Sequence, residues 1–190
     1  LSVVFSTAVR EWNWCESNPV SRVKMPKQPR GRVRFLSPEE REALLGECRK
    51  SASRSLETIV TLALSTGMRR GEILGLRWSD VDLKQGVIVL HQTKNGERRR
   101  VAVVSRALVL LREHGKVRPL GTDLVFPNKD LSKPFDPSQA FETVIERAGI
   151  KDFRFHDLRH SAASELAMGG ASLAEIAEIL GHKSFAMVKL

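Results

Sequence analysis

Histidine and arginine side chains gather in residues 156–160, His-Asp-Leu-Arg-His, and a further histidine follows at His182. His156 and Arg159 are three residues apart, so on a helix the two side chains share one face and can reach one ligand. An arginine guanidinium presents a planar fork of donors that matches phosphate oxygens. The spacing therefore predicts a binding site for a phosphate diester. A helix end with solvated histidines is the alternative interpretation of this segment alone.

A second candidate site lies in residues 66–72, Thr-Gly-Met-Arg-Arg-Gly-Glu. Gly67 ends a predicted apolar helix and Arg69 follows at once, at the rim of the core, where a cation can point into a cleft. Glu72, three residues further on, can hold the orientation of this arginine through a charge-assisted hydrogen bond. A surface arginine that complements the helix macrodipole is the alternative interpretation.

A third candidate is Lys94, which precedes the predicted hairpin turn Asn95-Gly96. A hairpin can enter a groove and carry an ammonium group to a leaving oxygen, where the lysine could act as a general acid. A solvated lysine at a hairpin tip is the more common case, so this residue alone predicts little.

The composition indicates a polyanionic partner. The 190 residues carry a formal net charge of +9. The basic residues cluster in two tracts, 22–34 and 98–100, and nucleic acid is the simplest partner for such tracts. A membrane surface is the competing partner, but no apolar stretch reaches membrane-spanning length. Cys15 and Cys48 lie in apolar helical patterns and are expected to be buried thiols of a reducing, intracellular protein.

The chain is expected to contain part of one domain and most of a second. Residues 1–16 have an amphipathic helical pattern that Asn18-Pro19 ends. Residues 1–20 are interpreted as the last helix of a truncated upstream domain, residues 21–34 as an extended basic linker, and residues 35–190 as the compact domain.

The compact domain is predicted to be mainly helical with one small antiparallel sheet, an α+β fold. Its first helix should start at a capping box, Ser37 to Glu40, and its last helix at a second box, Ser172 to Glu175. Ser105 is expected to cap a helix as well. The predicted helices are 38–48, 55–66, 70–76, 105–114, 138–148, 156–168 and 172–180. The predicted strands are 86–91, 99–104 and a short one at 124–126, and the glycines expected at helix C-termini are Gly149, Gly169 and Gly181.

Taken together, these elements resemble the tyrosine recombinases of the phage integrase family. The resemblance rests on Thr-Gly-Met-Arg69-Arg-Gly-Glu72, the hairpin Lys94, His156-Asp-Leu-Arg159-His160 and Leu-Gly-His182-Lys-Ser, in the order typical of that family. It covers about residues 35–190 and implies a site-specific recombinase that binds double-stranded DNA. It also implies that residues 1–20 end a core-binding domain.

The resemblance implies a role for each residue around one scissile phosphate. Arg69, Arg159 and His182 would donate to nonbridging oxygens and stabilise the pentavalent transition state. Lys94 would protonate the departing 5′ oxygen, and His156 would accept the proton of the nucleophile or donate to the phosphate.

Two further residues, Glu72 and His160, would hold these donor side chains in position without contacting the phosphate themselves. Cations of this kind need no metal ion, and no cofactor is expected.

The family nucleophile is a tyrosine, and this sequence contains none. In the family pattern it would stand immediately after Leu190, so we expect a truncated catalytic domain that binds DNA without cleaving it. The intact protein would act as a tetramer on paired DNA sites in the bacterial cytoplasm, associated with the nucleoid and encoded by a bacterium or phage. Residues 1–190 alone are expected to be monomeric.

Two other classes remain to be tested. Residues 172–184 also have the pattern of the first helix and turn of a helix-turn-helix, which would make the protein a transcription regulator. The residues after Ser184, Phe-Ala-Met-Val, are packing residues rather than base-reading ones. A basic nucleic-acid binder without chemistry would explain the charge but not the spacing of histidine and arginine.

Overall fold

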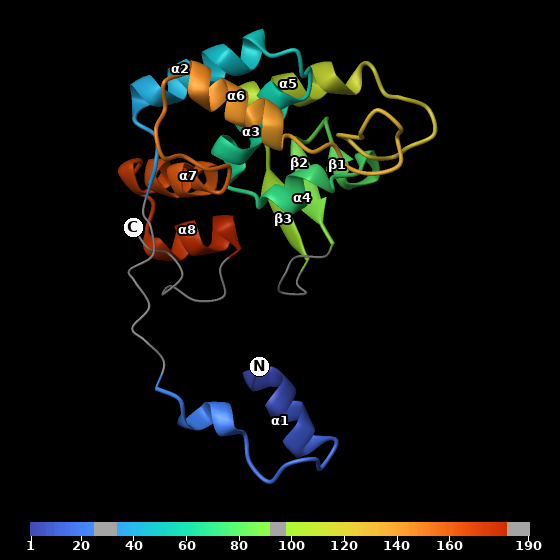
Figure 1. The fold of residues 1–190 in the computed structure, drawn as a ribbon. Coiled ribbons are helices and arrows are strands. Elements are labelled where there is room, and N and C mark those ends of the chain that lie inside the picture. The colour runs from blue at the N-terminus through green and yellow to red at the C-terminus, as the bar shows by residue number, and fades with distance from the viewer. Residues whose placement is uncertain (25–33, 92–97, 182–190) are drawn as a thin grey trace. The chain divides into compact units, whose positions relative to one another are not determined.

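The computed structural model describes residues 1–24, 34–91 and 98–181 (Figure 1). The chain divides into two compact units, Leu1–Arg32 and Val33–Leu190, which we call unit 1 and unit 2. No helix in the described part of the chain is both long and apolar enough to cross a membrane. The assignment of residues 1–20 to an upstream domain remains a prediction.

Unit 1 contains the helix α1 (Ser2–Arg10) and a 3-10 turn, Pro19–Arg22. The Asn18 side chain joins them: its amide nitrogen donates to the carbonyl oxygen of Ser2 at 3.0 Å, and its oxygen accepts from the backbone of the turn. The predicted continuation of α1 to residue 16 is wrong. The backbone leaves the helix after Arg10 and reaches a positive φ of 51° at Asn13.

A contact between two tilted indole rings accompanies the early end of α1. The rings of Trp12 and Trp14 lie 4.7 Å apart between centroids, an arrangement that residues two apart on a helix cannot reach. Cys15 follows this turn outside any helix and is only partly buried, so its predicted burial in a helical pattern is wrong. Cys48 is buried as expected, and burial raises the pKa of its thiol to about 12.

Unit 2 is mainly helical with one three-stranded antiparallel sheet, as predicted. Its helices are α2 (Pro38–Lys50), α3 (Leu56–Thr66), α4 (Arg70–Leu74), α5 (Ser105–Gly115), α6 (Ser138–Arg147), α7 (Asp157–Met168) and α8 (Leu173–Leu180), with a short 3-10 turn at Trp78–Asp80. Its strands are β1 (Val81–Asp82), β2 (Val87–Leu90) and β3 (Arg99–Ala102), in the order β1-β2-β3.

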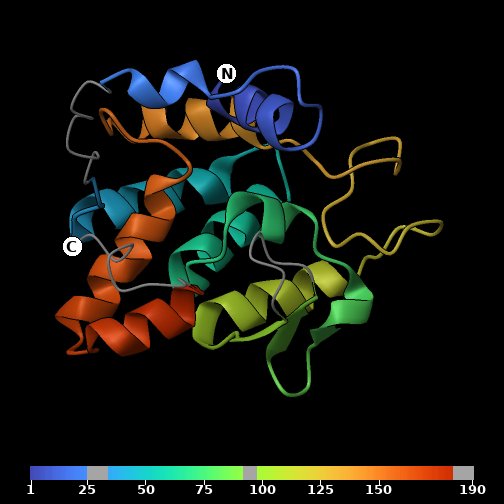
Figure 2. The ribbon, with the colours of Figure 1, turned by 90° about the horizontal axis from the view of Figure 1, so that it is seen from below.

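Helix α3 forms the centre of the core. Its residues from Thr58 to Leu64 are all buried, which is the pattern of a helix packed on every side. It packs against α2, α5 and α7, and Figures 1 and 2 show these helices around it. The site residues that flank α3 are therefore attached to a deeply buried helix of unit 2.

The sheet has a regular register, with Val87 opposite Ala102 and Leu90 opposite Arg99. Strand β1 was not predicted, because two residues are too few for an alternating pattern. The expected strand 124–126 is a single bridge between Arg77 and Leu124. The predicted turn Asn95-Gly96 lies outside the described residues.

Most of the predicted helix ends are confirmed. Both capping boxes, Ser37 with Glu40 and Ser172 with Glu175, are formed. The predicted cap at Ser105 is wrong: Ser105 is itself the first residue of α5, and the preceding Val104 supplies no side-chain cap.

Two glycines at helix ends differ in conformation. Gly181 ends α8 in the left-handed conformation, as expected for a helix C-terminus. After α7, however, the positive φ falls on Gly170 and not on Gly169.

Candidate functional site

Arg69 is held by Glu72 at the turn between α3 and α4. Helix α3 ends at Gly67 in the left-handed conformation, and Arg69 is the residue just before α4. The guanidinium Nη1 of Arg69 donates to Oε1 of Glu72 at 2.8 Å, and its backbone N–H donates to Oε2 at 2.9 Å. One carboxylate thus fixes both the backbone and the guanidinium of this arginine, which is the contact that the sequence suggested.

Arg159 lies on the first turn of α7, where its side chain is buried: the residue is 5% exposed. Its Nη1 donates to the carbonyl of Gly67 at 2.5 Å and its Nη2 to the carbonyl of Leu180 at 2.8 Å. It therefore joins the ends of α3 and α8. Burial and, to a smaller extent, the neighbouring Arg69 together lower the pKa of Arg159 to about 10, so the guanidinium is still charged at neutral pH.

His156 stands immediately before α7, and its ring meets that of His160 edge to face at 5.4 Å between centroids. Burial lowers the pKa of His156, and the neighbouring His160, Arg159 and Arg69 lower it further, against a smaller opposite effect of Asp157. The neutral imidazole is thus favoured at neutral pH. A neutral imidazole can accept a proton, whereas an imidazolium can only donate one.

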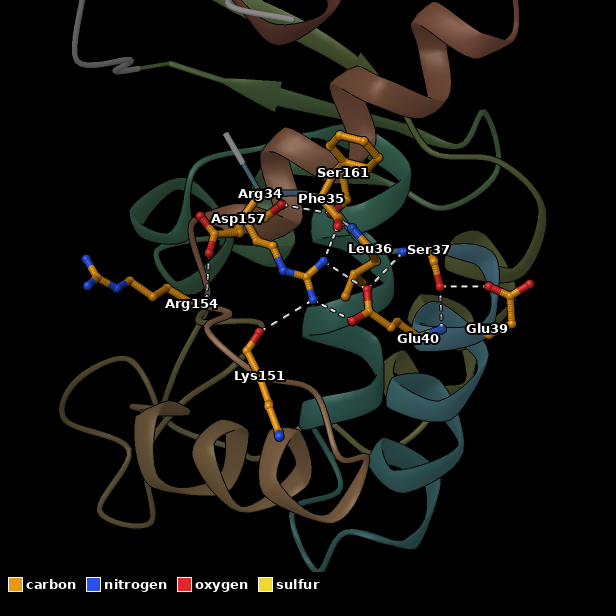
Figure 3. Close-up of polar contacts among 10 residues, drawn as sticks. All are labelled: Arg34, Phe35, Leu36, Ser37, Glu39, Glu40, Lys151, Arg154, Asp157 and Ser161. Atoms are coloured by element: carbon orange, nitrogen blue, oxygen red, sulfur yellow. Dashed lines mark hydrogen bonds and ion pairs between the residues drawn. The ribbon is translucent and has the colours of Figure 1, made fainter. Parts of the chain in front are cut away.

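The first turn of α7 is fixed by Asp157 and Ser161 (Figure 3). Asp157 Oδ2 accepts from the backbone N–H of Arg154 at 2.8 Å. The Ser161 hydroxyl donates to the Asp157 carbonyl at 2.9 Å and accepts from the backbone N–H of Leu36 at 3.0 Å. The helix that carries Arg159 is therefore tied to the beginning of unit 2.

Arg34 strengthens this tie from the other side. Figure 3 shows its guanidinium facing the Glu40 carboxylate, to which Nη1 donates at 2.9 Å and Nη2 at 2.5 Å. Its Nη2 also lies 3.5 Å from the carbonyl of Lys151, in the loop before α7. Arg34 was predicted to end the linker, but this residue contacts α2 and the loop before α7 within unit 2.

Arg99 is a third arginine at this place, and it was not singled out from the sequence. Its Nη2 donates to Oε2 of Glu72 at 3.1 Å and its Nη1 to the carbonyl of Ile179 at 3.1 Å. Its side chain is 12% exposed, and burial lowers its pKa. From the sequence, Arg99 was recognised only as part of the basic tract 98–100.

The three arginines converge on the C-terminal end of α8. Arg99, Arg159 and Arg69 donate to the successive carbonyl groups of Ile179, Leu180 and Gly181, the last at 3.3 Å. We call Arg69, Arg99 and Arg159 with Glu72 the arginine cluster. Three guanidinium groups beside one carboxylate leave an excess of positive charge, which suits an anion.

Two of the predicted site residues cannot be placed, because Lys94 and His182 lie outside the described residues. The structure thus brings together Arg69, Glu72 and Arg159, and it places His160 on the same helix as Arg159 and His156 immediately before that helix. Within the described residues, no group of histidine, cysteine or carboxylate side chains has a geometry that could hold a metal ion.

Comparisons with known proteins agree on one family. Residues 34–190 match the Phage integrase family. The chain is 40% identical over 195 residues to a shufflon-specific DNA recombinase of Escherichia coli, and this alignment covers 100% of the chain and 47% of the relative. The chain spans about half the length of the curated relatives it matches.

Solved structures with the same fold include the catalytic domain of bacteriophage HP1 integrase, with 28% identity and a TM-score of 0.63 over 83% of this chain and 85% of that domain. They also include the XerH site-specific recombinase bound to its difH substrate. It is 27% identical, with a TM-score of 0.69 over 81% of this chain and 48% of the other.

Proposed function

The chain belongs to the phage integrase family of tyrosine recombinases, and from this we propose that it is the catalytic part of a site-specific DNA recombinase. The proposed reaction cleaves and rejoins DNA strands through a 3′-phosphotyrosyl intermediate. The observation that carries the proposal is the convergence of Arg69 and Arg159 on the end of α8. These residues are 90 positions apart in the sequence, so the fold has to bring them together.

The chemistry follows from the donors that these side chains retain. Each η-nitrogen of Arg159 uses one hydrogen on a carbonyl and carries a second, so the guanidinium can also donate to a phosphate. Arg69, which Glu72 orients, would donate to another nonbridging oxygen. Together they would stabilise the charge that develops on phosphorus, and removing one such donor typically costs roughly 10²–10³ in rate.

Proton transfer completes the proposed step. A tyrosine oxygen attacks phosphorus and its proton passes to neutral His156, while the bond from phosphorus to the 5′ oxygen breaks and Lys94 protonates that oxygen. His182 would donate a further hydrogen bond to the phosphate. The nucleophile is expected directly after Leu190, and residues 1–190 alone would then bind DNA without forming the covalent link.

Double-stranded DNA is the proposed partner. The net charge of +9 supports it, and a relative with the same fold is known in complex with its DNA substrate. We expect a tetramer on paired sites for the intact protein, a monomer for residues 1–190, and a location with the DNA in the bacterial cytoplasm. Binding should weaken steeply with salt because phosphate contacts release counterions.

The regulator hypothesis is not favoured by these observations. Helix α8, its proposed first helix, packs against α7, and its C-terminal carbonyls accept from the arginine cluster. A regulator would give no reason for buried arginines at this point.

The test is covalent trapping by the full-length protein on a nicked suicide DNA substrate without added metal. We expect a covalent complex for the wild type and none for Arg159→Ala, whose noncovalent DNA affinity should be mostly retained. Arg147→Ala, which removes an exposed arginine of α6, should trap like the wild type. Equal loss of trapping and binding in Arg159→Ala would show that Arg159 only binds DNA.

A second substrate isolates the role of Lys94. A DNA with sulfur in place of the bridging 5′ oxygen has a leaving group that needs no proton. Lys94→Ala should therefore cleave ordinary DNA slowly and the sulfur-substituted DNA at close to the wild-type rate. Slow cleavage of both substrates would exclude Lys94 as the general acid.

A further inference from the structure

We propose that Arg99 is a positioning residue that sets the geometry of the phosphate site by holding Glu72 and the last turn of α8. This inference rests on the proposed function, since it concerns how the arginines of that site are held. Arg99 links three parts of the chain: strand β3, the turn that carries Arg69, and the end of α8 from which His182 follows.

The strand directs Arg99 inward. Arg99 is the first residue of β3 and lies on the same face as Val101, which is 5% exposed, because side chains alternate along a strand. Its neighbours Arg98 and Arg100 are exposed. Three consecutive arginines thus have different surroundings, and only the middle one enters the arginine cluster.

Glu72 is shared between two cations. Its Oε1 accepts from Arg69 Nη1 at 2.8 Å, whereas its Oε2 accepts from the backbone of Arg69 at 2.9 Å and from Arg99 Nη2 at 3.1 Å. The bond from Arg99 restrains the carboxylate from behind and leaves Oε1 directed at the guanidinium of Arg69. Without Arg99 the carboxylate can rotate, and the guanidinium of Arg69 moves with it.

The end of α8 is shaped to accept Arg99. The Nη1 of Arg99 donates to the carbonyl of Ile179 at 3.1 Å. A Cβ added at Gly181 would lie 2.5 Å from Nη1 of Arg99, and Gly181 has a positive φ of 68°. Glycine at 181 therefore allows both the left-handed turn and the close approach of the arginine.

Arg99 is placed to support the site rather than to touch the phosphate. Both η-nitrogens are engaged, and Nε is buried without a hydrogen-bond partner among the described residues. Leaving a buried donor unpaired is unfavourable, so the two η contacts must hold the side chain in this position.

The test compares Arg99→Gln with Arg100→Gln in the full-length protein, because both remove one charge from the same strand. Single-turnover formation of the covalent complex is measured at saturating suicide DNA. We expect the rate constant of Arg99→Gln to be about 10–100-fold lower, since a displacement of about 1 Å can cost roughly 10² in rate. The final amplitude and the noncovalent Kd should stay within about threefold of those of Arg100→Gln.

The pathway through Glu72 is tested by combining variants. If Arg99 acts on Arg69 through Glu72, then Arg99→Gln introduced into Glu72→Gln should lower the rate less than about threefold. Full multiplication of the two single effects would overturn this pathway. Arg99→Lys keeps the charge but lacks the planar fork, so its rate constant should remain low.

Other outcomes overturn the inference. Equal rate constants for Arg99→Gln and Arg100→Gln would overturn it. A lower amplitude and a lower melting temperature with an unchanged rate constant would also overturn it, because they indicate a merely structural role. A weaker Kd with an unchanged rate constant would make Arg99 a DNA contact instead. If Arg99→Gln does not fold, Arg99→Lys decides: a low rate constant supports the inference and a wild-type rate overturns it. Absence of a covalent complex in the wild type would instead refute the proposed function, and this inference with it.

Discussion

Arg99 and Arg159 donate hydrogen bonds to adjacent carbonyl groups, those of Ile179 at 3.1 Å and Leu180 at 2.8 Å. The last carbonyls of a helix lack partners within the helix, and its C-terminus attracts cations. Guanidinium groups satisfy both needs at the end of α8. Arg159, which is proposed to bind a phosphate, therefore also caps this helix beside Arg99, so an anion bound to Arg159 acts on the end of α8 as well.

The first prediction concerns anion binding without DNA. Because the arginine cluster has excess positive charge, sulfate should raise the melting temperature of the protein more than chloride does at matched ionic strength. At ten times its Kd, sulfate stabilises the folded state by about 1.4 kcal/mol. This corresponds to roughly 3–6 °C for a chain of this size.

A variant pair separates this site from the general salting effect of sulfate. The extra stabilisation should disappear in Arg159→Gln and persist in Arg147→Gln, which alters an exposed arginine. Equal stabilisation of both variants would place the sulfate elsewhere.

The second prediction concerns pH. The pKa of His156 is lowered from its ordinary value of 6.5, chiefly by burial. If neutral His156 accepts the proton of the nucleophile, the single-turnover rate should be constant near neutral pH and fall only below pH 6.5. His160 also lowers the pKa of His156, so His160→Gln should move this decline to higher pH. The His156→Gln variant should react slowly at every pH, with no decline of its rate below pH 6.5. If the rate of this variant still declines there, the decline reports the titration of another group.

The same shift affects stability. Since the folded state disfavours the cation, the unfolded state takes up the proton first as the pH falls through 6.5. The contribution of His156 to stability is therefore present above that pH and lost on acidification.

The third prediction concerns Gly67, which has a positive φ of 60° and lies against Leu180. Gly67→Ala should lower the free energy of unfolding by about 2–4 kcal/mol, because the backbone is strained and the added methyl overlaps the Leu180 side chain. Gly46→Ala is the control: it lies within α2 with nothing within 4 Å, and it should raise the stability by about 0.5–1 kcal/mol. Urea denaturation of both variants measures the difference, and a loss of similar size at both positions would contradict the packing described here.

The fourth prediction concerns Ser161, which is 4% exposed and accepts from the backbone N–H of Leu36. Ser161→Ala leaves this buried N–H without its partner and should lower the free energy of unfolding by about 1–3 kcal/mol. Ser132→Ala, at an exposed position, should change it by less than about 0.5 kcal/mol. If Ser161→Ala leaves the free energy of unfolding unchanged, the hydrogen bond between Leu36 and Ser161 contributes nothing to stability.

Local chemistry explains which parts of the fold the sequence predicts well. The capping boxes at Ser37 and Ser172 depend on residues three apart, and both are formed. The early end of α1 is accompanied by a contact between Trp12 and Trp14, which no helical period reveals. The failed cap at Ser105 shows that the residue type alone does not decide where a helix begins.

The site shows the same division. The contact between Arg69 and Glu72 spans three residues and follows from their spacing. The burial of Arg159 depends on Gly67 and Leu180, which are 92 and 21 positions away, so no local pattern predicts it. The position of Arg99 could have been predicted. In an alternating strand it shares a face with the buried Val101, so its side chain is directed toward the interior although the neighbouring arginines are exposed.

Arg34 has a practical consequence for anyone who wishes to study unit 2 by itself. Its guanidinium pairs with Glu40 and reaches Lys151, so a shortened protein beginning at residue 35 would leave the Glu40 carboxylate without this cation. A shortened protein that keeps the ion pair between Arg34 and Glu40 must therefore begin no later than residue 34, where the match to the integrase family also begins.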